Sequence, residues 1–323
     1  MDKKALVVIS AIENNVKKIK YKCSVEECSE HAINSHLLQK NGVLNAISEN
    51  GHLIQLRTKH IFSYEKDSYY EFKSVGINNA MSYPLFCNFH DNKIFQSIEL
   101  DFIDFSSLKT QQLISYRSLL AELYKKRVAI ERTKRILNAN TLSLSFEAKL
   151  EFSEFLKGSK LGEQDLLSFN AFLDEDILSE ASLNYTFVTY KYDLIKVCAS
   201  AIFSPLDLIN NSFLDLLNQE KPLDSVFINI VPHQDNLYVI LGYKNDCDDK
   251  WIKEYLKSWD NLNMNQLKFK ISDLLMTKIE TWAISPSIFK NIPKDIKLKM
   301  SEYWDENHNN FDNSRKFNFN IFN

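Results

Sequence analysis

The sequence predicts an α+β protein in which helices and antiparallel strands occupy different stretches of the chain. Residues 106–138 carry apolar side chains at helical spacing and no Gly or Pro that would interrupt a helix. Residues 185–203 are instead rich in β-branched and aromatic side chains, which favour strands. Pairs of Cys and His side chains in the first hundred residues indicate a further unit that binds a metal.

The first half of the chain predicts short elements followed by long helices. Apolar residues at helical spacing after residue 36 predict a short helix that ends near Gly51. Two alternating stretches around a polar turn then predict a pair of strands. The expected elements are, in order, a helix over 37–51, strands over 53–62 and 69–77, and helices over 106–138, 144–157 and 163–178.

The second half predicts a strand-rich region that ends in helices. Residues 225–232 and 236–243 are two strand-like runs joined by a short polar link, which is typical of a hairpin. Ser285 and Pro286 have the residue types of an N-cap and a first helical position. The other expected elements are helices over 248–257 and 265–276, a strand over 279–285, and a tail over 307–323 that is either disordered or a docking strand.

The composition excludes several classes of protein. A chain of 323 residues with six glycines contains neither of the glycine-rich phosphate-binding motifs, and no G-x-S-x-G nucleophile motif occurs. The net charge of −3 means that any nucleic-acid surface is local. No apolar run is long enough to span a membrane, and five cysteines argue against a secreted disulfide framework. We therefore expect a cytoplasmic protein.

Two close pairs of side chains predict one zinc site. Cys23 and Cys28 form the first pair, and Cys87 and His90 form the second, each in polar surroundings. Thiolate and imidazole are the ligands that zinc prefers, and four of them make a closed structural site. Two such pairs separated by a long insert are the arrangement of a treble-clef zinc module.

The alternative is that these cysteines are buried apolar residues, which is what we expect of Cys198 and Cys247. His31 is an alternative ligand within the first pair's loop. On the zinc interpretation the chain divides into three regions. These are a treble-clef module over 1–100, a helical segment over 101–180, and an α+β region with antiparallel strands over 181–323.

The residues around the two pairs resemble the HNH, or His-Me finger, endonucleases. "AINSH" follows the first pair, and "LFCNFHDNKIF" contains the second. The likeness covers about 80 residues, and uncharacterised bacterial proteins share the same SH and FCxxHD signature. In that family a treble clef presents a catalytic histidine on its hairpin, and a magnesium or manganese ion assists phosphodiester hydrolysis.

The resemblance assigns roles to particular residues. His36 matches the general base that takes a proton from the attacking water, and Asp91 matches a ligand of the catalytic ion. Asn79, or its neighbour Asn78, matches the residue that orients the base. Ser35 stands where many members carry a metal-binding Asp, and the interval from His36 to the second zinc pair is longer than usual.

Two alternatives to catalysis remain open at this point. Ser35 has the residue type of an N-cap, so His36 could simply begin a helix. The module could equally be an inactive zinc scaffold for an interaction surface, because a shared fold does not establish a shared activity.

Charge is unevenly distributed in the helical segment. Between Lys109 and Arg135 there are eight basic and two acidic residues, a net charge of +6, whereas 151–185 has eight acidic residues and two lysines, a net charge of −6. The basic end of the long helix favours contacts with nucleic-acid phosphates. Its residues are Lys125, Lys126, Arg127, Arg132, Lys134 and Arg135.

The alternatives for this basic end are a solvated helix face and pairing with the acidic block. We expect DNA or RNA as the partner, and the C-terminal region as a contact for a second copy or another protein. A nuclease joined to an unassigned region is typical of bacterial antiviral defence effectors, a role that rests on analogy alone.

Overall fold

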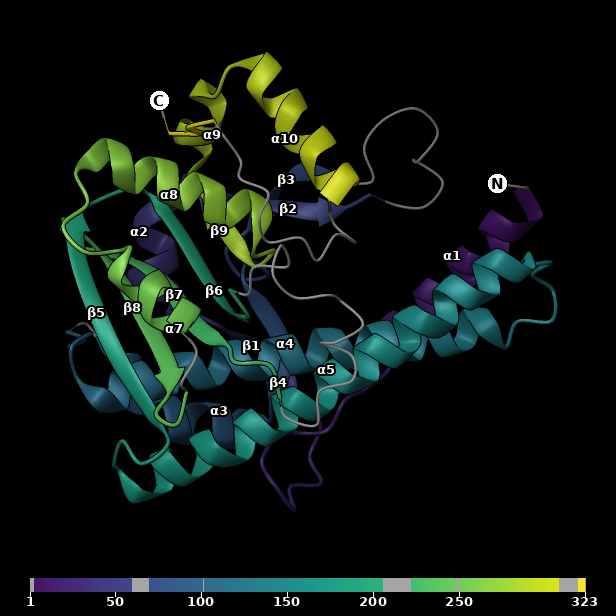
Figure 1. Ribbon diagram of the computed structural model, residues 1–323, viewed down its shortest axis with the longest axis horizontal. Coiled ribbons are helices and arrows are strands. Elements are labelled where there is room, and N and C mark those ends of the chain that lie inside the picture. The colour runs from purple at the N-terminus through teal and green to yellow at the C-terminus, as the bar shows by residue number, and fades with distance from the viewer. Residues whose placement is uncertain are drawn as a thin grey trace.

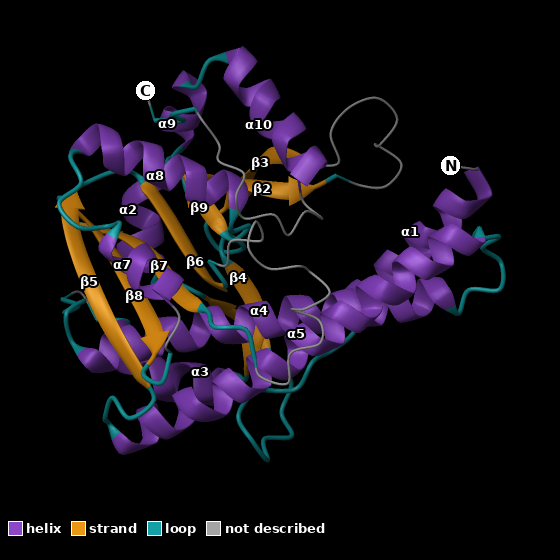
Figure 2. Ribbon diagram, in the orientation of Figure 1, coloured by secondary structure: helices purple, strands orange, loops and turns teal. Residues whose placement is uncertain are grey.

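The computed structural model describes residues 3–59, 70–100, 102–205, 222–247, 250–307 and 319–322. It is a mixed helical and antiparallel-sheet structure, which confirms the predicted α+β class (Figures 1 and 2). Parts of the predicted strand at 53–62, the turn after it and most of the tail at 307–323 lie outside the described residues. Among the described residues, no helix is both long and apolar enough to cross a membrane.

Seven of the described strands form one antiparallel sheet in the order β3-β2-β9-β6-β7-β8-β5. They are β2 (His52–Thr58), β3 (Tyr70–Gly76), β5 (Tyr185–Asp193), β6 (Val197–Phe203), β7 (Val226–His233), β8 (Asn236–Lys244) and β9 (Trp282–Ile284). The predicted hairpin is present as β7 and β8, joined through Gln234 in the left-handed region (φ 52°). Two strands of the first hundred residues, β2 and β3, thus continue the sheet of the C-terminal region.

Helices cover both faces of the sheet, so its central strands are buried on both sides (Figure 1). Phe227 and Val231 of β7 face the long helix α4 (Leu108–Leu137), while Ile228 and Ile230 face the other layer. That layer contains α7 (Lys250–Lys257), α8 (Met264–Thr277) and α10 (Lys294–Asn307). Alternate residues of one strand therefore pack into two cores, which explains its continuous apolar run.

The predicted boundaries at 100 and 180 do not coincide with a break in packing. One buried cluster runs from Leu37 and Phe86 through Leu120 of α4 to Phe227 and Ala283 of the sheet. At the contact between α4 and the sheet, Ser118 Oγ donates to Asn229 Oδ1 (2.8 Å) and lies 2.7 Å from Ser200 Oγ. The helix and the sheet are therefore joined by polar as well as apolar contacts.

The prediction of two helices at 144–157 and 163–178 was wrong, because these residues form one helix, α5 (Phe146–Ser179). An interior glycine costs about 1 kcal/mol relative to alanine, and packing against α4 outweighs this cost. Gly162 faces α4, since a Cβ at that position would lie 3.3 Å from Lys126 Cε. The helix α1 (Lys3–Lys17) was not expected from the sequence. It lies at the C-terminal end of α4, where its Ile12 and Val16 pack in one cluster with Ile136.

The short helix α9 (Pro286–Asn291) follows Ser285 as predicted, but a distant residue caps it. Glu49 Oε1 accepts hydrogen bonds from the Ser287 backbone N–H (3.1 Å) and from Ser285 Oγ (2.7 Å). Hydrogen bonding with the hydroxyl groups of Ser287 and Ser285 holds the pKa of the Glu49 carboxyl below its usual range. The loop before β2 is thereby tied to the segment after β9.

The N-terminal residues add a two-stranded ribbon beside the main sheet. β1 (Ile33–His36) pairs antiparallel with β4 (Ser82–Phe86), and α3 (Asn88–Phe95) follows β4 directly. The helix predicted over 37–51 is shorter in the structure. It consists of a π-helical turn, η1 (Lys40–Leu44), followed by one α-helical turn, α2 (Asn45–Ile47). It ends before Gly51, whose φ of 71° favours glycine.

The turn from α5 into β5 depends on one buried carboxylate, which gives a prediction for stability. Asp176 is fully buried and accepts backbone N–H bonds from Leu183 (3.1 Å), Asn184 (2.8 Å) and Tyr185 (2.9 Å). Asp176→Ala leaves these donors without an acceptor, so we expect unfolding free energy to fall by about 3 kcal/mol. Chemical denaturation measures it. Glu154→Ala, an exposed change on the same helix, serves as the control; equal stability of the two variants would contradict the assignment.

Candidate metal centre and its surroundings

The first pair of ligands is held by a short loop. Cys23 N–H donates to Glu30 O (2.9 Å), Cys28 N–H donates to Val25 O (3.2 Å), and Glu27 takes a left-handed φ of 61°. These contacts fold residues 23–30 into a knuckle that turns both thiols the same way. Ser24 fixes the knuckle to β4, because its N–H (2.9 Å) and Oγ (2.8 Å) both donate to Leu85 O.

The second pair comes from the start of α3. Cys87 is the residue before the first turn of the helix, and His90 lies within that turn. The strand β4 that receives the knuckle therefore leads directly to the other two ligands. This arrangement brings together side chains that are far apart in the sequence. Cys28 and Cys87 are separated by 59 positions, and Cys23 and His90 by 67.

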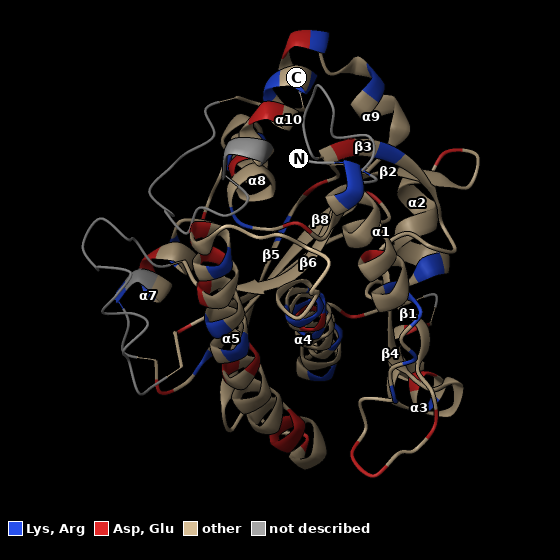
Figure 3. Ribbon diagram, turned by 90° about the vertical axis from the view of Figure 1, so that its right-hand side faces the viewer, with Lys and Arg blue, Asp and Glu red and all other residues tan. Residues whose placement is uncertain are grey.

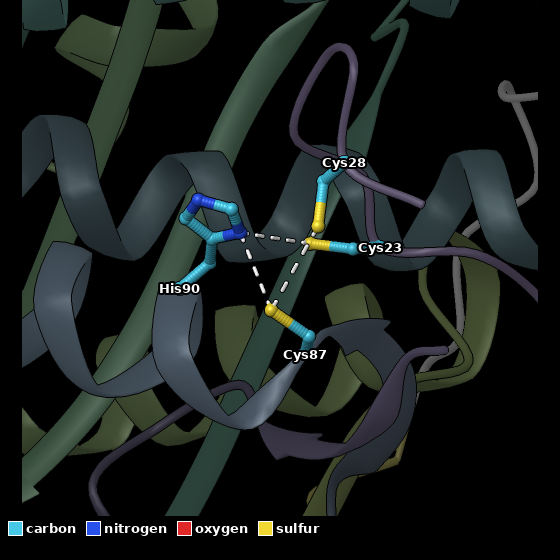
Figure 4. A group of neighbouring side chains, drawn as sticks. All are labelled: Cys23, Cys28, Cys87 and His90. Atoms are coloured by element: carbon cyan, nitrogen blue, oxygen red, sulfur yellow. Dashed lines mark hydrogen bonds between the residues drawn. The ribbon is translucent and has the colours of Figure 1, made fainter. Parts of the chain in front are cut away.

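The four side chains converge as the sequence predicted (Figure 4). Their ligand atoms all lie within 4.8 Å of one another, with Cys28 Sγ 4.0 Å from Cys87 Sγ. His90 Nδ1 lies 3.4 Å from Cys23 Sγ and 3.3 Å from Cys87 Sγ. Tetrahedral zinc sets S···S edges of about 3.8 Å and S···N edges of about 3.5 Å. The group can therefore hold a metal ion such as zinc, and His31 is not part of it.

The chemistry of the thiols suits a metal site. The hydrogen bond from the His90 backbone N–H, followed by other contacts at the helix start, lowers the pKa of Cys87, whereas burial raises that of Cys23. Cysteine binds a metal ion as the thiolate. The lowered pKa of Cys87 favours this form, which suits the binding of a cation. Cys198 and Cys247 are buried free cysteines, as predicted, and burial raises the pKa of Cys198 to about 12.

His36 ends strand β1, and its ring is held by the backbone. Its Nε2 lies 2.9 Å from Ile77 O. A carbonyl only accepts, so Nε2 carries the hydrogen and Nδ1 of the neutral ring carries the lone pair. Burial lowers the pKa of His36, the charges of Lys40 and Arg117 lower it further, and the Ile77 carbonyl and Glu99 oppose them. The ring is therefore neutral and basic near pH 7.

Ser35 is a strand residue and not a helix cap. The interpretation of "SH" as the start of a helix was wrong, because residues 33–36 pair with β4. Ser35 is fully buried opposite Tyr83, and its Oγ makes no hydrogen bond within the described part of the protein. Alternation along the strand then directs His36 to the opposite side.

Asp91 lies in a small network of charges beside the ribbon. Arg117 of α4 contacts Asp91 Oδ1 through Nη2 (3.5 Å) and Glu99 Oε1 through Nη1 (2.7 Å). The guanidinium also lies over the ring of Phe95, 3.9 Å from its centroid. Sequence analysis missed Arg117 and Glu99, although Asp91, Phe95 and Glu99 have the four-residue spacing of one helical face.

Asn79 and Asn78 have other contacts. Asn79 O accepts from Arg57 Nη2 (3.4 Å), and Asn78 Oδ1 accepts from Lys40 Nζ (3.5 Å). The group that holds the His36 ring is the backbone carbonyl of Ile77, one residue before this pair.

The six basic residues in the C-terminal half of α4 fall into two sets, three that pair with a carboxylate and three others. Figure 3 shows the Lys and Arg positions of this helix in blue. Lys125 Nζ forms an ion pair with Glu122 Oε1 (2.6 Å) and donates to Thr281 Oγ1 (3.0 Å). These contacts hold its ammonium group against the protein and away from solvent. Arg127 pairs with Glu163 of α5 (3.1 Å), and Arg135 pairs with Glu131 (2.7 Å). The remaining three are Lys126, Arg132 and Lys134.

No family model, no curated protein and no solved structure matches this chain.

Removing one ligand tests the metal centre. We expect about one zinc per chain in the purified protein, since four ligands of this kind close a structural site. Cys87→Ser removes a thiolate and should lose the metal together with much of the thermal stability. Elemental analysis and thermal unfolding measure the two effects. Cys198→Ala, which changes a cysteine within β6, should keep the metal; equal metal content in both variants would contradict the assignment.

Proposed function

We propose that the chain is a metal-dependent nuclease of the HNH type, which cleaves DNA or RNA beside a structural zinc ion. The observation that carries the proposal is the position of His36. It lies on the strand that pairs with β4, and β4 leads into the helix that carries Cys87, His90 and Asp91. A knuckle, a ribbon and a helix that share one metal are the elements of a treble clef, with the base on the ribbon.

The state of His36 supports its role as the general base. A base must be unprotonated at working pH, and its free nitrogen must be reachable by water. The ring is half-buried, its pKa is lowered, and Ile77 O binds the protonated Nε2. Nδ1 is then the atom that takes the proton from the attacking water.

Asp91 supports a site for a divalent cation. Its carboxylate is 21% exposed, and it contacts Arg117 through Oδ1, so Oδ2 is the oxygen that would bind a cation. A carboxylate is a suitable ligand for Mg²⁺ or Mn²⁺. Such an ion would stabilise negative charge on the leaving oxygen.

The basic end of α4 supports a nucleic-acid substrate. Arg117 lies beside Asp91, and Arg132 is fifteen residues further along the same helix, or about 22 Å at 1.5 Å per residue. Lys126, Arg132 and Lys134 could therefore contact phosphates away from the cleaved bond. Lys125, Arg127 and Arg135 contribute less, because each is already paired with a carboxylate.

The alternative function is a non-catalytic interaction protein scaffolded by zinc. The exposed apolar residues at one end of the molecule favour it: Phe146 is 77% exposed, and Val7 and Leu150 are about half exposed. They lie where α1 and the ends of α4 and α5 project from the sheet (Figure 1). A second copy or another protein would cover such a surface.

A single substitution separates the two functions. We expect His36→Ala to lower the rate of plasmid or RNA cleavage about 10²–10⁴-fold, because this removes the general base. The zinc content should stay unchanged. His52→Ala, which alters an exposed histidine at the start of β2, should keep the activity. Equal activity of wild type and His36→Ala on both nucleic acids would favour the interaction protein.

The pH dependence of cleavage follows from the lowered pKa of His36. The base is lost when the ring is protonated, so the rate should fall only as the pH drops below the ordinary histidine pKa of about 6.5. A rate profile between pH 5 and 8 measures this. An acid limb above pH 7 would show that His36 is not the base.

A further inference from the structure

We propose that the projecting ends of α1, α4 and α5 form a dimer interface, on which a second copy of this chain packs (Figure 1). A second copy fits because this end of the molecule carries both an apolar groove and an apolar ridge of opposite charge. The inference goes beyond the proposed nuclease activity and does not depend on it.

Helix α1 is apolar around its whole circumference, but only one side of it is covered. Residues 5–9 are five consecutive apolar residues, which complete more than one helical turn. Ile12 and Val16 are buried in the cluster with Ile136 of α4, whereas Val7 is 54% exposed. A helix that is apolar all round is typically buried all round. Helix α1 therefore has an apolar side that the described part of the chain leaves open.

The open side of α1 forms one wall of a groove of about 590 Å³, and the C-terminal end of α4 forms the other. Val7, Val8 and Ala11 line the groove from α1. Lys134 and Ala139 line it from the end of α4 and the residues that follow. The groove is therefore mostly apolar and includes a cation.

The start of α5 forms a ridge on the same end of the molecule. Phe146 is 77% exposed and Leu150 is 50% exposed, and their four-residue spacing places them on one face of the helix. Glu147 and Glu151, both exposed, form the adjoining stripe. The ridge begins seven residues after Ala139, the last residue that lines the groove.

The charges of the groove and the ridge are opposite. The charged residues that line the groove are Glu131, Lys134 and Arg135. Glu131 pairs with Arg135 (2.7 Å), so the remaining charge is that of Lys134, which has no ion pair among the described residues. Residues 146–155 contain three glutamates and one lysine, a net charge of −2. Apolar contact at the centre and opposite charges at the rim are typical of a specific protein interface.

The presence of both features on every chain favours a second copy over another protein. Two copies related by a two-fold axis each place their ridge in the partner's groove, so the same contact forms twice. Lys134 then faces the partner's Glu151, and contact with nucleic-acid phosphates is left to Lys126 and Arg132.

The mass of the purified full chain in solution tests the inference. We expect sedimentation equilibrium at micromolar concentration to give twice the mass of one chain. Phe146→Ala should weaken the dimer at least about tenfold, because aromatic side chains at the centre of an interface contribute most to its affinity. Phe269→Ala, which changes an exposed phenylalanine on α8, should dimerise like wild type. A wild-type chain that is monomeric at its highest soluble concentration would overturn the inference, as would equal dimerisation of the two variants.

Reversal of charge tests the pairing of groove with ridge. Glu151→Lys and Lys134→Glu should each weaken the homodimer, because each places like charges opposite one another. Mixed in equal amounts, the two variants should form a heterodimer, since each supplies the charge that the other has reversed. A heterodimer also shows that both variants are folded. Lys253→Glu, an exposed change on α7, should leave the homodimer unchanged. Single variants that dimerise like wild type, or a mixture that stays monomeric, would contradict this interface.

Discussion

The convergence of three thiols and one imidazole is the constraint on which the candidate site depends. The knuckle at 23–28 and the start of α3 are far apart in the sequence, and their ligand atoms lie within 4.8 Å of one another. Three thiols and an imidazole brought this close form a ligand set for a cation, because thiolate and neutral imidazole are the forms that bind metal ions. Hydrogen bonds from Ser24 hold the knuckle against β4, and β4 pairs with β1. An ion bound by the four side chains would also join the knuckle to α3. The position of His36 follows from that chain of contacts.

The main sheet supplies the second constraint. The long helix α4 packs on β6 and β7, and the same helix carries Arg117 to Asp91 and Glu99. The network of Arg117, Asp91 and Glu99 is therefore built from α3, the segment after it and the long helix α4. Glu49, which caps α9, adds a further connection between the first hundred residues and the last. The position of Arg117 depends on how α4 packs on the sheet. A change in that packing, far from the four Cys and His side chains, would therefore move Arg117 relative to Asp91 and Glu99.

The sequence predicted what depends on local pattern. Spacing and residue type were enough to predict the α+β class, the long helix and the β7–β8 hairpin. They also predicted that the four Cys and His side chains lie together. They did not predict the continuity of α5, because packing of its apolar side chains, such as Leu166 and Phe169, in the core that it shares with α4 outweighs the local preference of glycine. Membership of β2 and β3 in the C-terminal sheet depends on the pairing of β2 with β9, more than two hundred residues away. Arg117 and Lys125 lie about two turns apart on one basic helix. Only their contacts with Glu99 and Thr281, outside that helix, show that both side chains turn inward.

X-ray absorption at the zinc edge is the most direct test of the central claim, that one ion joins these four side chains. The account predicts a first shell of three sulfur atoms at about 2.3 Å and one nitrogen at about 2.0 Å. A shell of nitrogen and oxygen atoms, or a protein that carries no zinc when purified intact, would contradict it. In that case the thiols would be ordinary cysteines, and the nuclease proposal would lose the metal on which its treble clef depends.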